Sequence, residues 1–89
     1  MKREEAIALI KDMVVSCEDL GVLGIMLMLS SAVVARSQGY QVHIKTEGDE
    51  HTFVCIARVA KKHNLAVCIK REEDLIVIYQ PLPERPYDS

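Results

Sequence analysis

Residues 20–35 read Leu-Gly-Val-Leu-Gly-Ile-Met-Leu-Met-Leu-Ser-Ser-Ala-Val-Val-Ala, and this run without a charged side chain is the most unusual feature of an 89-residue chain. Drawn as a helix, the run is apolar around most of its circumference, so more than one side of it must be covered. We expect a central helix that begins after a cap at Ser16 or Asp19 and ends near Ser37, before Gly39. One side is covered by the sheet, and the other by the helix expected at the amino terminus or by another copy of the chain. The excess of apolar surface predicts that the chain forms a homo-oligomer.

The same run is too short to span a membrane. It holds about 16 residues, whereas a helix needs about 20 apolar residues to cross the hydrocarbon core. The amino-terminal residues do not read as a secretory signal, because Glu4, Lys11 and Asp12 interrupt any apolar segment. We therefore expect a cytoplasmic protein that does not contact a membrane.

Composition places the chain among globular domains. Apolar residues make up 49% of it and charged residues 27%, which is far from the pattern of disordered proteins. The net charge of −2 gives no general attraction for nucleic acid or anionic lipid. We expect one α+β domain over residues 1–80 and an extended proline-rich tail over residues 81–89.

Hydrophobic periodicity predicts the other elements. A helical stripe runs through residues 2–16, although the adjacent Val14 and Val15 also fit a short strand over residues 13–16. Asn64 is suited to the left-handed conformation that ends a helix. The expected ranges are strands over 40–46, 65–69 and 75–79, a helix over 50–63 and a charged turn over 70–74.

These elements predict a two-layer α+β sandwich. A strand, helix, strand connection is right-handed and leaves its two strands parallel, whereas the closing hairpin is antiparallel. We expect a small mixed sheet with helices on one face. The order is α-α-β-α-β-β, or β-α-β-α-β-β if residues 13–16 form a strand.

The cysteines give neither a disulfide motif nor a metal motif. Cys17, Cys55 and Cys68 are odd in number and widely spaced, without a Cys-x-x-Cys pair, so we expect reduced thiols. His51 and Cys55 lie four residues apart on a predicted helix, but two side chains do not make a metal site. We expect no metal and no cofactor.

Three segments carry a resemblance to a known family. They read Gly-Tyr-Gln-Val-His-Ile at residues 39–44, Ala-Lys-Lys-His-Asn-Leu at 60–65 and Lys-Arg-Glu-Glu-Asp-Leu-Ile-Val-Ile at 70–78. Over about half of its length the chain resembles the SirA-like or TusA-like small sulfur carriers. In that family the cysteine of a Cys-Pro-x-Pro motif carries sulfur as a persulfide at the start of the first long helix. Cys17-Glu-Asp-Leu stands at that place without either proline, and the resemblance implies that Cys17 is the sulfur-carrying thiol.

A ligand site is expected at the carboxyl ends of the first two strands, where sheets of this kind tend to place ligands. The loop after residues 40–46 should approach the charged turn there. Acidic side chains at Glu47, Asp49 and Glu50 favour instead a solvated turn, because they already satisfy the positive end of the following helix. The candidate ligand-binding residues are Thr46, Gly48, His51, Thr52, Lys70 and Arg71.

The sequence holds no recognisable catalytic arrangement, since it lacks a Ser, His, Asp order at plausible reach and a glycine-rich phosphate loop. Its cations form one group at residues 58–63 and another at residues 70–71, roughly 20 Å apart at about 3.3 Å per strand residue, which disfavours nucleic acid as a partner. The predicted function is a non-enzymatic, self-associating binding or accessory module, and a protein partner is compatible with it. Sulfur carriage by Cys17 and weak nucleic-acid binding are the alternatives.

Overall fold

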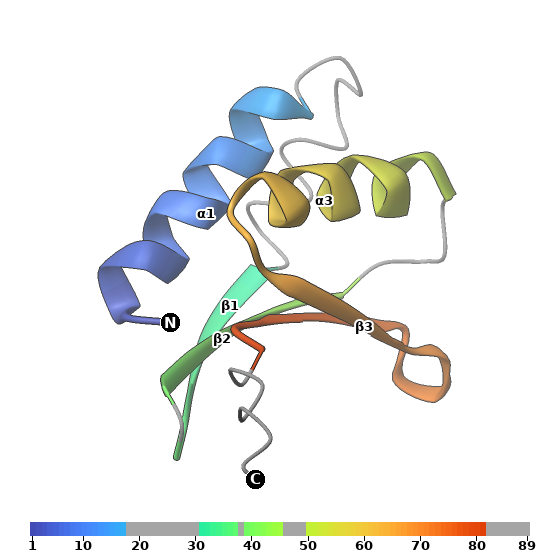
Figure 1. Ribbon diagram of the computed structural model, residues 1–89. Coiled ribbons are helices and arrows are strands. Elements are labelled where there is room, and N and C mark those ends of the chain that lie inside the picture. Colours follow the sequence, from blue (N-terminus) through green and yellow to red (C-terminus); the bar gives the residue numbers. More distant parts are fainter. Residues whose placement is uncertain (18–30, 38, 46–49, 82–89) are drawn as a thin grey trace, which may run out of the picture.

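Within the part of the chain that the structure describes, two helices lie on one face of a four-stranded antiparallel sheet (Figure 1). The computed structural model describes residues 1–17, 31–37, 39–45 and 50–81. The predicted α+β class, with two layers and the helices on one face, is confirmed. The elements are α1 (Arg3–Ser16), β1 (Ser31–Arg36), β2 (Gly39–Lys45), α3 (Glu50–Lys62), β3 (Ala66–Lys70), the 3-10 turn η2 (Arg71–Glu73) and β4 (Leu75–Tyr79).

α1 is the amphipathic helix that the sequence predicts. Its buried stripe, Ala6, Leu9 and Met13, recurs every three or four residues, and each of these side chains is at most 1% exposed. The Cys17 N–H donates to the Met13 carbonyl at 2.8 Å, so the last turn is helical. The alternative strand over residues 13–16 is therefore wrong, because burial of Met13 one turn after Leu9 outweighs the strand preference of two adjacent valines.

Residues 31–36 form strand β1 and not the end of a central helix. β1 pairs with β2 over its whole length, finishing with Arg36 opposite Gly39. Adjacent valines fit this pleated backbone, and pairing with β2 gives hydrogen-bond partners to the backbone N–H and C=O groups of β1. Gly39, expected to end a helix, instead begins β2 with a φ of 118°, which suits glycine. The rest of the predicted helix, residues 20–30, lies outside the described residues.

The strand order is β1-β2-β4-β3, and every neighbouring pair is antiparallel. The predicted mixed sheet is therefore wrong in its pairing. β2 and β3 do point the same way, as their helical connection requires, but β4 lies between them and pairs with both. The reason is burial, because Ile76, Val77 and Ile78 are at most 5% exposed, and a continuous apolar strand belongs in the centre of a sheet.

The segment from α3 to β4 follows the sequence prediction to within one residue at each boundary. α3 ends at Lys62, and Asn64 takes the predicted left-handed conformation with a φ of 59°. The charged turn between β3 and β4 is present as η2, followed by Asp74 with a φ of 51°. Local turn chemistry therefore fixes this half of the described fold.

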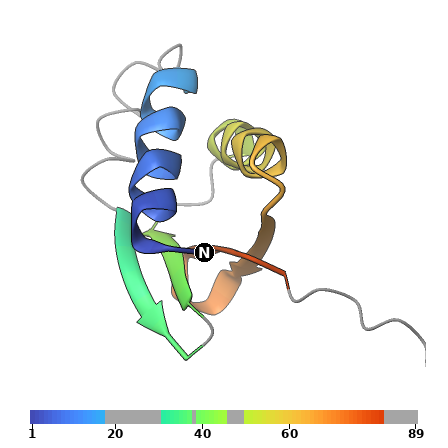
Figure 2. The ribbon, with the colours of Figure 1, turned by 60° about the vertical axis from the view of Figure 1, so that its left-hand side comes forward.

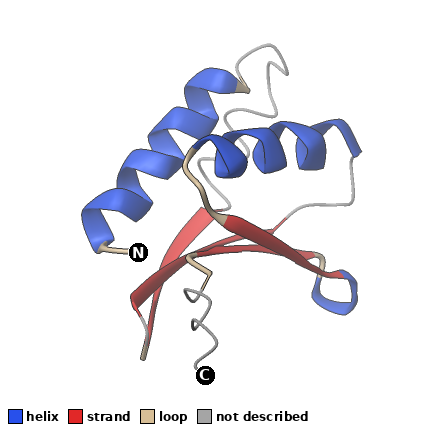
Figure 3. Ribbon diagram, viewed as in Figure 1, coloured by secondary structure: helices blue, strands red, loops and turns tan. Residues whose placement is uncertain are grey.

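The core lies between the helix layer and the sheet (Figure 3). α1 lies over β1 and β2, α3 lies over β3, and the two helices contact each other (Figure 2). α1 therefore packs on the sheet itself, and its expected contact with a helix over residues 20–30 lies outside the described residues. No described helix has the length and apolar character needed to cross a membrane. The largest fully buried apolar side chains are Leu9, Met13, Ile44, Ile56, Ile76, Ile78 and Val42.

Candidate functional site

The sheet face opposite the helices is covered by neither described helix (Figure 1). Side chains alternate along each strand, and Val42, Ile44, Ile76 and Ile78 fill the core on the helix side. The intervening positions therefore form the other face, which we call the helix-free face. It comprises Ala32, Val34 and Arg36 of β1, Gln41, His43 and Lys45 of β2, Ala66, Cys68 and Lys70 of β3, and Leu75, Val77 and Tyr79 of β4.

The helix-free face has an apolar centre and a positively charged rim. Val77 at its centre is 5% exposed, whereas Arg36, Lys45 and Lys70 at its ends are exposed. None of the strand positions on this face is acidic, although the whole chain carries a net charge of −2. Positive charge therefore predominates at the strand positions of this face, where an anionic partner is attracted. Glu73 of the adjoining η2 turn is the acidic group that acts on His43.

The register of the strands sets the spacing of these cations. Lys45 and Lys70 both lie opposite Leu75, one on either side, which places their Cα atoms roughly 10 Å apart at about 4.8 Å per strand spacing. Arg36 lies opposite Gly39, at the far end of β2 from Lys45. Arg36 is therefore roughly 20 Å from the Lys45 and Lys70 pair along the strands, at about 3.3 Å per residue.

His43 lies between the two groups of cations. Its Nε2 is 3.0 Å from Gln41 Oε1, so the carboxamide oxygen accepts from the tautomer that is protonated at Nε2. Burial lowers the pKa of His43 below its ordinary value of 6.5, and the positive charges of Arg36 and Lys70 lower it further, while Glu73 acts in the opposite direction. The lowered pKa of His43 favours its neutral form.

A pocket of about 260 Å³ lies at the Arg36 end of the sheet. The amino-terminal residue closes one side of it, because the Tyr40 N–H donates to the Met1 carbonyl at 2.8 Å. The guanidinium of Arg36 donates to the Ala35 carbonyl at 3.1 Å. The lining offers a guanidinium, hydroxyl and carboxamide groups and no carboxylate side chain. The lining residues are Met1, Arg36, Ser37, Gly39, Tyr40, Gln41, Tyr79 and Gln80.

The ligand-binding residues predicted from the sequence fall into three environments. Thr46 and Gly48 lie outside the described residues. His51 is exposed in the first turn of α3, but Thr52 is 3% exposed, and its Oγ1 has no hydrogen-bond partner among the described groups. Lys70 and the neighbouring Arg71 are exposed near the β3–β4 turn. Lys70 alone of the six belongs to the helix-free face, and the grouping of all six around one ligand stays a prediction.

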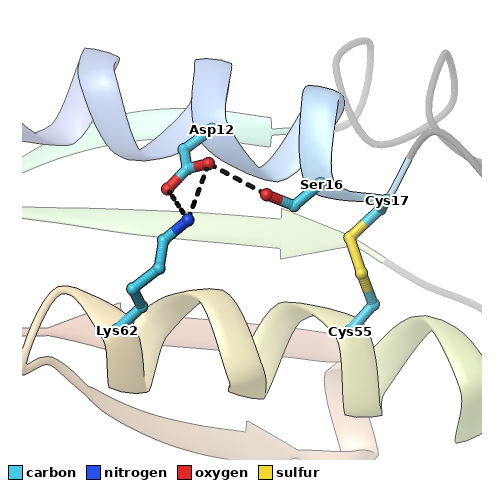
Figure 4. The surroundings of a disulfide bond; sticks show 5 residues. All are labelled: Asp12, Ser16, Cys17, Cys55 and Lys62. Carbon is cyan, nitrogen blue, oxygen red and sulfur yellow. Dashed lines mark hydrogen bonds and ion pairs between the residues drawn. A yellow bond between two sulfur atoms is a disulfide. The ribbon is translucent and has the colours of Figure 1, made fainter.

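Cys17 and Cys55 form a disulfide bond between the end of α1 and the middle of α3 (Figure 4). The expectation of reduced thiols is therefore wrong for these two residues. α1 and α3 lie side by side and bring the two Cα atoms to 6.1 Å, within the usual range for a disulfide, although 38 residues separate them in sequence. Cys17 is 1% exposed. Cys68, on the helix-free face, is a free and exposed thiol.

The Cys55 sulfur, which the spacing from His51 offers as a candidate metal ligand, is bonded to Cys17 and is not free to bind a metal ion. Among the described residues, no group of three or more His, Cys, Asp or Glu side chains is placed to hold a metal ion.

A second link between the helices is an ionic cluster centred on Asp12 (Figure 4). Lys62 Nζ lies 3.0 Å and His63 Nε2 lies 2.7 Å from Asp12 Oδ2, and the Ser16 hydroxyl donates to Asp12 Oδ1 at 2.9 Å. The hydrogen bond from His63, followed by those from Lys62 and Ser16, holds the pKa of Asp12 well below its usual range. Lys62 and His63, two of the cations that the sequence offers for nucleic-acid binding, are thus turned toward α1.

The sequence prediction included the rim cation Lys70 but missed Arg36 and Lys45, for identifiable reasons. Arg36 falls in a segment that was expected to be helical, and Lys45 reads only as the polar position of an alternating strand. The signal that could have found them is the alternation itself, which places Gln41, His43 and Lys45 on one face. Comparison of the chain with protein-family models, with curated proteins and with solved structures found no match.

Proposed function

We propose that this chain is a non-enzymatic binding module that holds an anionic partner on its helix-free face. The observation that carries the proposal is the placement of Arg36, Lys45 and Lys70 around an apolar centre without an acidic residue on the same strand positions. Guanidinium and ammonium groups are the donors that bind carboxylate and phosphate groups. The partly exposed apolar side chains of Val34 and Leu75 on the same face add contact area that does not depend on charge.

The pocket at the Arg36 end supports the same partner chemistry. Its side-chain hydroxyl and carboxamide groups can donate hydrogen bonds to an oxyanion, and its volume of about 260 Å³ accommodates a small anionic group. Because Arg36, Gln41 and Tyr79 belong both to the pocket and to the helix-free face, a bound chain can occupy the two together.

A titration of the full chain with a polyanion tests this proposal. With ¹⁵N-labelled protein and poly-glutamate at low salt, amide shifts should concentrate on β2 and β4. The double variant Lys45→Gln, Lys70→Gln should weaken binding. The double variant Arg58→Gln, Lys61→Gln is the matched control, because it removes the same charge from exposed positions on α3. Equal weakening by both pairs, or shifts confined to the helices, would refute the proposal.

Self-association stays a prediction from the sequence. Stacking two copies with the helix-free faces together brings the rim cations of both copies into one interface, where like charges oppose each other. A homo-oligomer would therefore use another surface. Sedimentation equilibrium at high micromolar concentration tests it, and a monomer at that concentration would contradict the prediction.

Sulfur carriage by Cys17 has less support than anion binding. The Cys17 sulfur is bonded to Cys55 and almost fully buried, so a persulfide at this position would require reduction of the bond and exposure of the thiol. Incubation of reduced protein with a persulfide donor, followed by intact mass measurement, tests this alternative. Gain of one sulfur atom in wild type and not in Cys17→Ala would support it.

The thiol state in the cell also tests the predicted cytoplasmic location. Cytoplasmic proteins usually keep their thiols reduced, whereas oxidising compartments favour disulfides. Rapid alkylation at lysis should label three cysteines if the protein resides in a reducing compartment. Labelling of Cys68 alone would indicate an oxidising one and contradict the predicted location.

A further inference from the structure

The helix-free face combines charge with aromatic side chains, and this combination narrows the class of partner. We infer that the anionic partner is single-stranded nucleic acid, with one base held against Tyr79 in the pocket at the Arg36 end and with phosphates contacting Arg36, Lys45 and Lys70. This inference rests on the proposed function, because it identifies the partner of the same face.

The spacing of the cations fits an extended single strand. The cations occupy both ends of the face, separated along the strands by the length of β2. An extended strand of about four nucleotides, the lower end of site sizes known for single-strand-binding folds, presents repeated phosphates over a surface of this kind. Between the two ends lie the partly exposed side chains of Val34 and His43, which can contact sugars and bases.

The lining of the pocket at the Arg36 end fits a nucleotide base. Tyr79 of β4 lies on the helix-free face and lines the pocket, and a base can stack on its ring when it is not already stacked in a duplex. Tyr40 lies on the helix side of β2, where it packs against the core. Gln41 and Gln80 in the same lining offer both carboxamide donors and acceptors, which match the edge of a base. An acidic peptide has no flat ring to stack there, so the lining favours a nucleotide over a carboxylate chain.

A duplex fits this surface less well. The grooves of double-stranded DNA admit a helix or a two-stranded ribbon, whereas the helix-free face is a broad four-stranded surface. The tyrosine pocket also requires an unstacked base. Of the cations that the sequence offered for nucleic acid, Lys70 lies on this face, whereas Lys62 and His63 are paired to Asp12 on the helix side.

Salt dependence gives a quantitative test. Three phosphate contacts by a single strand predict a slope of about −2 for log K against log [salt], so affinity should fall about 20-fold between 50 and 200 mM salt. Lys45→Gln, Lys70→Gln should reduce the slope to about −0.7 and the fall to about 3-fold. Arg58→Gln, Lys61→Gln on α3 should leave the slope unchanged.

The tyrosine pocket has its own variants. Tyr79→Ala should weaken binding of a single strand at least about 5-fold, since base stacking on an aromatic ring contributes roughly 1–3 kcal/mol. Tyr79→Phe keeps the ring and should bind as wild type does. If Tyr79→Ala does not fold, Gln80→Ala at an exposed position is expected to weaken the single strand and not poly-glutamate.

Fluorescence anisotropy should compare a labelled eight-nucleotide RNA of mixed sequence, its duplex and a poly-glutamate of equal charge. Tighter binding of the single strand, with loss in Tyr79→Ala, supports the inference. Equal binding of poly-glutamate, unaffected by Tyr79→Ala, overturns the inference but leaves the proposed function standing. Preference for the duplex also overturns it. Failure to bind any of the three contradicts the proposed function as well.

Discussion

Reduction of the Cys17–Cys55 disulfide should lower the free energy of unfolding by about 4 kcal/mol. The bond joins residues 38 apart in sequence, and in the chain-entropy model closing a loop of that length removes about 13 cal/mol/K from the denatured chain, or about 4 kcal/mol at 25 °C. A domain of 89 residues has a total stability of roughly 4–13 kcal/mol. The bond therefore supplies about a third or more of the stability.

Urea unfolding followed by circular dichroism measures this effect. Comparing wild-type protein with and without dithiothreitol isolates the contribution of the disulfide to stability, because no amino acid is substituted. The reduced form should unfold at lower urea with a larger m-value, since its denatured chain exposes more surface. Its Tm should fall by about 15–30 °C. Cys68→Ser is the control, because this thiol is free and exposed, and it should retain the full response to reductant.

The reasoning fails if wild type unfolds identically with and without reductant while mass spectrometry confirms that the bond is present when oxidised. It also fails if purified protein that was never exposed to reductant shows three free thiols. In the first case the bond would contribute nothing to stability, and in the second α1 and α3 would be held together by packing and by the Asp12 cluster without the covalent link.

Three further predictions concern single residues. Gly39→Ala should lower stability by about 1–3 kcal/mol, because φ is 118° and a Cβ would lie 2.9 Å from the Met1 carbonyl oxygen; an unchanged urea midpoint would contradict this. Asp12 has a lowered pKa, so the stability that it confers is present above its ordinary pKa of 3.8 and is lost as pH falls through the folded value. Wild type should therefore exceed Asp12→Asn in stability at pH 7 and lose that advantage in acid, as measured by urea midpoints from pH 2 to 7. His43 also has a lowered pKa, so the free energy of unfolding of the unbound protein should fall as pH drops below 6.5, because the unfolded chain binds the proton more readily. Polyanion affinity measured by anisotropy should instead rise as His43 gains a charge. The groups that act on His43 are Arg36, Lys70 and Glu73, and a His43→Gln variant should remove both responses.

The candidate site was only partly accessible from the sequence. Alternation places Gln41, His43 and Lys45 on one face of a strand, so one of the three rim cations, Lys45, can be placed from spacing alone. Arg36 joins them only when residues 31–36 pair with β2, and Tyr79 reaches the pocket only because β4 lies beside β2. Periodicity describes one element at a time, and it does not determine which strands become neighbours.

The sequence by itself determined the elements whose signals are local. The stripe of α1, the alternation of β2 and the left-handed stop at Asn64 follow from side-chain period and turn preference, which act within a few residues. Only the tertiary structure decided that residues 31–36 form a strand, that β4 is central and that Cys17 meets Cys55. These outcomes depend on contacts between distant segments, where burial and backbone pairing outweigh the modest intrinsic preference of a short apolar run.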